Sequence, residues 1–209
     1  MNFYSQYGED AIISNFINQK SVGNILDIGA NDGKMLSNSL HFIENGWGAT
    51  LIEASPICFK RLQRLHAGND KVQSLNYCLS NESKKVVFYH NTSHLQKDDV
   101  DLLSTISMES YVGSKNSGNP FETFEIQSHR FDEIQSQLLY SKYDIISIDI
   151  EGYDLEILKQ IDLKKFDCKV LVIEYNNVQT TKNLIMDYCS MYDLKNVLHD
   201  NKTNLILTA

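Results

Sequence analysis

The chain has 209 residues, of which 42% are hydrophobic and 22% charged, and its formal net charge at pH 7 is −8. This length suits one domain, residues 1–209, with a sizeable core. No apolar run approaches the roughly 20 residues of a membrane span, and the amino-terminal residues lack the basic start of a secretory signal. The negative charge offers no global attraction to nucleic acid or to an anionic membrane. We therefore expect a cytoplasmic protein that acts on a neutral or cationic small molecule.

Short β-branched or aromatic runs alternate along the chain with stretches of helical periodicity. This alternation predicts an α/β fold with a doubly wound, mostly parallel sheet that is covered by helices. The expected elements, in chain order, are helix 8–19, strand 24–28, helix 34–45, strand 48–53, helix 56–66, strand 72–77, strand 121–127, helix 130–140, strand 143–150, helix 154–161, strand 169–175 and helix 180–191.

The rhythm breaks over residues 90–120, which are rich in Ser, Asn, Lys and Asp. A loop of this length is usually functional or disordered. Because it follows the first half of the sheet, we weigh a substrate lid evenly against a flexible insertion.

One turn carries most of the functional information. Residues 27–33, Asp-Ile-Gly-Ala-Asn-Asp-Gly, follow directly on an apolar strand. Gly29 and Gly33 lack Cβ and let a ligand approach the backbone. A dinucleotide pyrophosphate prefers three glycines and no nearby anion, whereas this turn has Asn31 at the middle position and carries Asp27 and Asp32. These charges favour a cofactor with an ammonium and a sulfonium group, and S-adenosylmethionine (SAM) is the common one.

The next predicted strand ends in a second acidic residue, Glu53. An acid at this place accepts hydrogen bonds from the two ribose hydroxyls of an adenosine. Ser55-Pro56 follows as a helix start, with an N-cap and a proline in the first turn. The alternative is that Asp27 and Glu53 are ordinary solvated carboxylates at strand ends.

The chain ends in two strand-like runs, 194–199 and 204–207, joined by a polar turn. A connection this short makes the pair antiparallel. With the five parallel strands, this hairpin completes a seven-stranded sheet of the kind seen in SAM-dependent methyltransferases. Nicotinamide-binding folds usually continue the parallel crossover instead.

Several segments together resemble the FkbM-type methyltransferases, a branch of the class I, Rossmann-like SAM-dependent fold. The resemblance runs over most of the chain, and Asn31 is usual in that family. The segments are SQYGED at 5–10, DIGANDG at 27–33, IEASP at 52–56, NYCLS at 76–80, SIDIEGYD at 147–154 and VIE at 172–174.

The resemblance implies methyl transfer to hydroxyls, commonly of sugars or of polyketide products, and it implies cofactor roles position by position. Asp27, Gly29 and Gly33 are expected to face the methionine part of SAM, together with the turn residue Asn31, and Glu53 the ribose. The adenine is expected beside Ala54, Asn76 and Cys78. Gln6 and Gly8 are expected to close over the site from the amino-terminal segment, although helix packing would also account for residues 5–10.

Three carboxylates are expected where methyl transfer would occur. Asp149 and Glu151 stand two positions apart at the end of one predicted strand, and Glu174 ends the next. They either hold a divalent cation such as Mg²⁺ that acidifies the acceptor, or their repulsion raises one pKa so that this group acts as general base. We favour the version without metal. His129 is a further candidate base, although such a histidine is more often an ordinary surface residue.

Two readings of the function follow. The first is a SAM-dependent O-methyltransferase acting on a sugar hydroxyl or another small polar metabolite. The second is a non-catalytic module that keeps the SAM fold and serves as a binding partner.

The lone cysteines, Cys78 included, are predicted to be reduced packing residues rather than nucleophiles.

Overall fold

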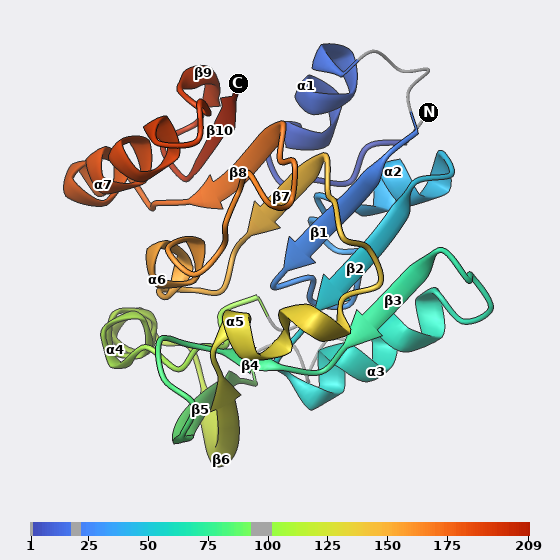
Figure 1. The fold of residues 1–209 in the computed structure, drawn as a ribbon. Coiled ribbons are helices and arrows are strands. Elements are labelled where there is room, and N and C mark those ends of the chain that lie inside the picture. The colour runs from blue at the N-terminus through green and yellow to red at the C-terminus, as the bar shows by residue number, and fades with distance from the viewer. Residues whose placement is uncertain (1, 18–21, 93–101) are drawn as a thin grey trace.

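The structure is a computed structural model and describes residues 2–17, 22–92 and 102–209. Its centre is a seven-stranded sheet with strand order β3-β2-β1-β7-β8-β10-β9 (Figure 1). The strands are β1 (Asn24–Ile28), β2 (Gly48–Ile52), β3 (Val72–Leu75), β7 (Ile145–Ile148), β8 (Val170–Glu174), β9 (Asn196–Asp200) and β10 (Asn204–Thr208). β10 runs antiparallel to β8 and β9, and the other pairs are parallel. The predicted wound sheet with a terminal antiparallel hairpin is confirmed.

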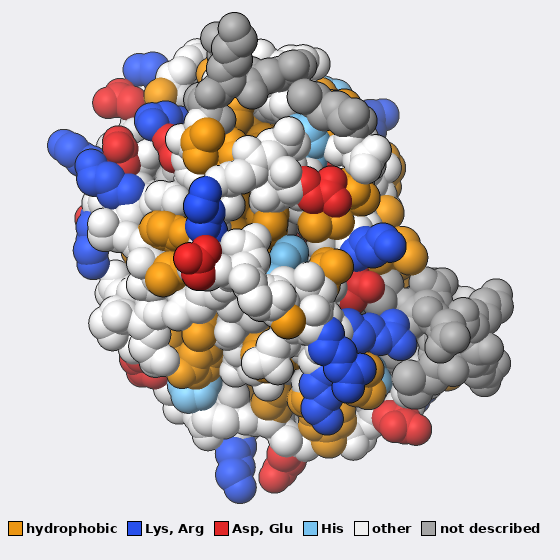
Figure 2. Space-filling model, turned by 90° about the vertical axis from the view of Figure 1, so that its right-hand side faces the viewer, with side chains coloured by type: hydrophobic (Ala, Val, Ile, Leu, Met, Phe, Trp, Pro, Cys, Tyr) orange, Lys and Arg blue, Asp and Glu red, His pale blue; other side chains and the backbone are white. Residues whose placement is uncertain are grey.

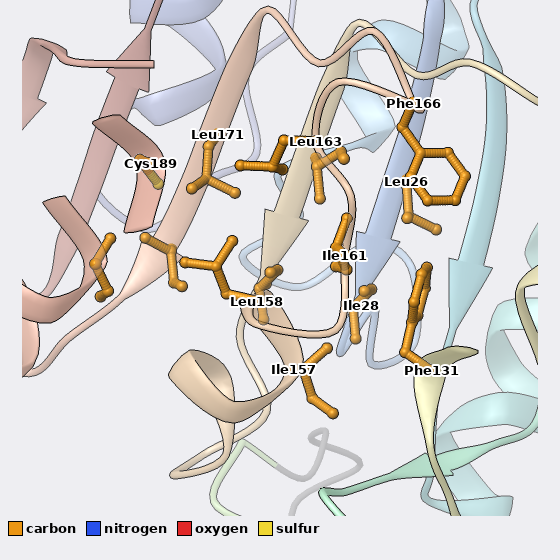
Figure 3. Close-up of a cluster of buried hydrophobic side chains, with 14 of the residues drawn as sticks. Leu26, Ile28, Phe131, Ile157, Leu158, Ile161, Leu163, Phe166, Leu171 and Cys189 are labelled. Atoms are coloured by element: carbon orange, nitrogen blue, oxygen red, sulfur yellow. The ribbon is translucent and has the colours of Figure 1, made fainter. Parts of the chain in front are cut away.

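Helices cover both faces of this sheet, so its central strands are apolar on both sides. Within β1, Leu26 and Ile28 belong to one buried cluster and Ile25 to the other. The first cluster includes side chains from α5 (Phe131–Ile134), α6 (Asp154–Leu158) and α7 (Gln179–Ser190). Figure 3 shows part of it, with Ile157 and Leu158 of α6 among the strand residues. The second cluster takes side chains from α1 (Glu9–Phe16), α2 (Leu40–Glu44) and α3 (Pro56–Leu65).

A smaller sheet lies beyond the carboxyl ends of the central strands, where the hairpin of β5 and β6 projects at the bottom of Figure 1. It has the order β4-β6-β5, with β4 (Cys78–Leu79), β5 (Lys85–Asn91) and β6 (Phe121–His129). Strand β5 was not predicted from the sequence. Predicted strand 121–127 is present, and it continues to His129 to pair with Leu79.

The segment 90–120 is not the structureless loop that its composition predicts. It contains the end of β5 and the helix α4 (Met108–Asn116). The Ser107 hydroxyl caps α4 by accepting a hydrogen bond from the Ser110 N–H at 3.3 Å. Residues 93–101 lie outside the described residues, so the proposal of a lid can be followed only from residue 102 onward.

The predicted helix 34–45 is helical only over α2, because side chains compete for its first backbone N–H groups. Asp32 Oδ1 accepts from the N–H groups of Lys34 and Met35 at 2.9 and 2.8 Å. Leu36 then takes a positive φ of 53°. The Ser37 hydroxyl accepts from the Leu40 N–H, and only from there does the helix proceed.

The predicted helix 130–140 is also shortened. After α5 the chain forms one 3-10 turn at Gln135–Gln137 and becomes extended at Leu138. No helix in the described parts of the chain has both the length and the apolar character that crossing a membrane requires.

Candidate cofactor and active site

A cavity of about 590 Å³ opens at the carboxyl ends of β1, β2, β7 and β8. This volume is in the range of small-molecule and cofactor sites, and the place is where ligands of open α/β sheets bind. Ten of the residues predicted from the sequence line it: Gln6, Asp27, Gly29, Asn31, Glu53, Ala54, Cys78, Asp149, Glu151 and Glu174.

The glycine turn joins three strands at the floor of the cavity. The N–H groups of Gly29 and Ala30 both donate to the Ile52 carbonyl, at 2.9 and 3.0 Å, and the Asp149 N–H donates to the Ile28 carbonyl. Gly29 has a φ of +91°, and a Cβ built on it would lie 1.7 Å from the Asp149 carbonyl oxygen. A glycine is therefore required here so that β1 and β7 can approach, in addition to any approach by a ligand.

Glu53 is oriented by the backbone around it. Its Oε2 accepts from the Asn31 N–H at 2.8 Å, and its Oε1 accepts from the Ser55 N–H at 2.6 Å. Asn76 supports this turn by donating to the backbone carbonyls of Glu53 and Ala54. The carboxylate is thus held at the edge of the cavity in one orientation.

Asp27 is almost fully buried, with 4% of its surface exposed. Burial raises the pKa of Asp27 to about 6, and hydrogen bonds from the hydroxyls of Ser39 and Ser147 counteract part of this effect. A carboxylate in this state gains most from a cationic partner, because such a partner replaces the water that burial removed.

The cluster of carboxylates after β7 does not consist of the three residues predicted from the sequence. Carboxylate oxygens of Asp149, Asp154 and Glu174 lie within 4.8 Å of one another, and Glu151 is not among them. β7 ends at Ile148 and Glu151 has a positive φ of 59°, so the strand geometry that would place Asp149 and Glu151 on one face does not persist.

This cluster fits the metal-free interpretation better than the metal site. Asp154 accepts hydrogen bonds from the N–H groups of Ile150 and Gly152, at 2.9 and 3.0 Å, so it holds the turn before its own helix. Burial raises the pKa of Asp149, and the nearby carboxylates, Asp154 first, raise it further. Burial and the negative charge of Asp149 likewise raise the pKa of Glu174.

The structure places four predicted site residues outside the cavity wall. Gly8 has a φ of +82° and precedes α1 as its N-cap. Gly33 lies against Leu62 and His66 of α3 and its C-cap, leaving no room for a Cβ. Asn76 acts through the backbone of residues 53 and 54, and His129 packs edge-on against the Tyr77 ring at 5.0 Å. Asn76 and His129 therefore reach the cavity wall only indirectly, Asn76 through Glu53 and Ala54 and His129 through Tyr77.

The cavity also includes residues that the sequence analysis did not name individually. Leu102 to Ile106 line it, and they belong to segment 90–120, which the sequence marks as either a substrate lid or a flexible insertion. Thr105 fixes this segment, because its backbone pairs with Tyr89 and its hydroxyl donates to the Glu151 carbonyl at 2.7 Å. Gly152 faces Ser107 and Ser110 at the start of α4. The positions of Leu102 to Ile106 depend on tertiary contacts, which the local sequence does not predict.

Cys78 lines the cavity as a packing residue. Burial, with the nearby charge of Glu53, raises the pKa of its thiol to about 12. A thiol with this pKa is protonated at neutral pH and is not a nucleophile.

A parallel sheet that ends in an antiparallel hairpin, with an acidic glycine turn after β1 and an acid after β2, defines the class of SAM-dependent methyltransferases. Comparison with known proteins gives the family. The profile of the methyltransferase FkbM domain matches residues 27–198, and the chain belongs to this family of SAM-dependent methyltransferases. No curated protein matches the chain.

The solved structures that share the fold include the following two. The crystal structure of Methyltransferase FkbM from Methylobacillus flagellatus KT superposes with a TM-score of 0.58 at 14% identity, covering 90% of this chain and 44% of that chain. The METTL16 MTase domain superposes with a TM-score of 0.50 at 14% identity, covering 95% of this chain and 65% of that chain. The chain therefore spans less than two thirds of the length of either.

The net charge does not describe every face of the molecule. Helix α3 carries Lys60, Arg61 and Arg64, and Figure 2 shows a group of Lys and Arg side chains on the face that it draws. The exclusion of nucleic acid rests on the total charge and on the absence of an Asn/Asp-Pro-Pro-Tyr motif from the sequence, so it stays a prediction.

Proposed function

We propose that this protein is a SAM-dependent O-methyltransferase that transfers a methyl group to a hydroxyl of a sugar or another small polar metabolite. The observation that carries the proposal is the charge of the cavity. Among the described residues, its lining contains five carboxylates, those of Asp27, Glu53, Asp149, Glu151 and Glu174, and no Lys, Arg or His. Such a wall attracts a sulfonium and repels a pyrophosphate.

The chain's residues suit the parts of SAM in turn. Asp27 and the turn after β1 face the positively charged methionine part, and Glu53 is oriented to accept hydrogen bonds from the ribose. Ala54 and Cys78 border the adenine, beside Tyr77. SAM, when bound, supplies an electrophilic methyl group on its positively charged sulfur.

The chemistry left to the protein is to align the acceptor and to take its proton. As the acceptor oxygen bonds to the methyl carbon, the carbon–sulfur bond breaks and the hydroxyl proton passes to a carboxylate. Asp149 is our choice for this general base. Because its pKa is raised by burial and by neighbouring carboxylates, it binds a proton more strongly than a solvated aspartate does. Glu174 shares the cluster and is proposed to share that proton.

A hydroxyl acceptor without negative charge fits the rest of the wall. Gln6, Asn176, Thr203 and Asn204 add amide and hydroxyl groups to the lining of the cavity. These groups donate and accept hydrogen bonds, as the hydroxyls of a sugar do. We place the protein in the cytoplasm and propose neither a nucleic acid nor a membrane as its partner.

Calorimetric titration with SAM tests the first half of the proposal, and absence of binding at millimolar SAM would end it. A screen with methyl-labelled SAM against hydroxylated sugars, nucleotide sugars and an RNA oligonucleotide tests the second half. Transfer to RNA alone would overturn the acceptor class. SAM binding with no acceptor in a broad screen would favour the non-catalytic binding module.

A further inference from the structure

The amino-terminal segment 4–8 runs along the rim of the cavity, which Gln6 and Tyr7 both line. On one side, Ser5 forms a parallel bridge with Leu36, which also lines the cavity. On the other side, the turn between β9 and β10 contributes Thr203 and Asn204 to the wall. Two ends of the chain therefore meet at this rim.

Glu9 connects these two ends. Its Oε1 accepts hydrogen bonds from the Asn204 and Asn201 side-chain amides, at 2.7 and 2.9 Å. Its Oε2 accepts from the Tyr7 N–H at 2.9 Å. The residue has 0% of its surface exposed. Although burial opposes it, these hydrogen bonds, with that of Asn204 the strongest, lower the pKa of Glu9, so the carboxylate is charged at neutral pH.

The neighbouring residue Asp10 differs from Glu9, because its hydrogen bonds are local. Asp10 is also fully buried, but within the described part of the chain its carboxylate accepts only from groups of its own segment, including the Tyr4 N–H at 2.6 Å and the Ser5 hydroxyl at 2.6 Å. Asp10 therefore shapes the amino-terminal segment. Glu9 reaches from that segment to residues 192 and 195 positions away. A charge at a helix start needs no burial to interact with the helix dipole, so the helix does not explain the burial of Glu9.

We propose that Glu9 is a positioning residue that holds Gln6 and Tyr7 against the β9–β10 turn, so that the amino-terminal segment closes over the bound methyl donor. This inference rests on the proposed function, since it takes the ligand beneath the segment to be SAM. Hydrogen bonds to a charged group are stronger than neutral ones. Glu9→Gln keeps the shape of the side chain but loses the charge and the acceptor for the Tyr7 N–H.

The test compares wild type, Glu9→Gln and the matched control Glu44→Gln. Glu44 accepts from the Tyr4 hydroxyl at 2.9 Å, so it anchors the same segment but does not line the cavity. Calorimetry measures SAM affinity, and hydrogen exchange measures how far SAM protects residues 4–8. We expect Glu9→Gln to weaken SAM binding about tenfold and to lose that SAM-dependent protection. Glu44→Gln should stay within about twofold of wild type and keep the protection.

A reciprocal variant separates positioning from a general loss of stability. Glu9→Gln combined with Asn204→Asp places an amide opposite a carboxylate again, and it should recover at least about threefold of the lost affinity. If Glu9→Gln has a strongly lowered Tm, this folded double variant carries the test. Wild-type SAM affinity and protection in Glu9→Gln, or no recovery in the double variant, would overturn the inference alone. Failure of the wild type to bind SAM would overturn the proposed function and this inference with it.

Discussion

The carbonyl oxygen of Asp149 fills the place that a side chain on Gly29 would need. A Cβ on residue 29 would come within 1.7 Å of that oxygen, and the φ of +91° is one that other residues rarely adopt. The same contact lets the Asp149 N–H donate to the Ile28 carbonyl, so the glycine turn that lines the cavity also sets the position of the proposed base.

Gly29→Ala should therefore destabilise the whole domain. The positive φ and the forced separation of β1 from β7 together should lower the free energy of unfolding by roughly 2–5 kcal/mol. Urea denaturation followed by circular dichroism measures this. Gly113→Ala is the matched control, because residue 113 lies in α4 with nothing within 4 Å of its added Cβ. The control should be neutral or stabilised by up to about 1 kcal/mol. Equal stability of both variants would mean that β1 and β7 are not in this contact.

Replacing Asp27 should stabilise the free protein while it weakens cofactor binding. The pKa of Asp27 is raised from 3.8 to about 6, so folding favours its protonated form. Its stabilising contribution is complete below pH 3.8 and is lost as the pH rises through about 6. Asp27→Asn should thus raise the free energy of unfolding at pH 8 by up to about 3 kcal/mol. Denaturant titrations at pH 5 and pH 8 measure it, and the gain should be present mainly at pH 8.

The same titration makes SAM binding depend on pH. A cationic ligand favours the ionised Asp27, so wild-type affinity for SAM should increase as the pH rises through about 6 and then level off. Asp27→Asn should bind SAM more weakly at pH 8 and should show a smaller step, because Asp149, whose pKa burial raises to about 7, still titrates in this range. Calorimetry over pH 5–8 measures both. A variant with the wild-type pH profile would show that Asp27 does not face the positive charge.

The sequence could predict the central sheet because its strands are buried on both faces, which makes them continuous apolar runs such as Val170–Ile173. It could also place Asp27 and Glu53, since each follows from its position at the end of such a run. The sequence did not predict that helix 34–45 would be shortened to Leu40–Glu44. That outcome depends on Asp32 and Ser37, whose side chains accept from backbone N–H groups in place of the helix.

The candidate catalytic group shows a further limit of sequence reasoning. Spacing along an extended strand joined Asp149 to Glu151, but β7 stops before both. Asp154 enters the cluster because its side chain accepts from the Ile150 and Gly152 N–H groups, in a local turn that neither the strand period of two nor the helix period of 3.6 describes. Likewise, Thr105 and Asn204 reach the cavity through contacts with residues far away in sequence.

Methyl transfer should not depend on a divalent cation. Asp154 already uses its oxygens on backbone N–H groups, which leaves Asp149 and Glu174 as the remaining carboxylates of the cluster. Rates measured with labelled SAM before and after dialysis against a chelator should agree within about twofold. A loss of activity that Mg²⁺ restores would instead establish a metal site at these carboxylates.

Asp149→Asn should separate cofactor binding from catalysis. The amide has the same shape but cannot accept the acceptor's proton, so kcat should fall about 100-fold or more while SAM affinity stays within about threefold.

Two matched variants make the comparison specific. Glu156→Gln removes a carboxylate of α6 that pairs with Lys159 at the surface, and it should leave kcat unchanged. His129→Ala removes the other base predicted from the sequence, which packs behind Tyr77 and does not line the cavity. It should change kcat by less than about threefold. A large loss of kcat in His129→Ala together with a near-normal Asp149→Asn would transfer the role of base from the carboxylate to the imidazole.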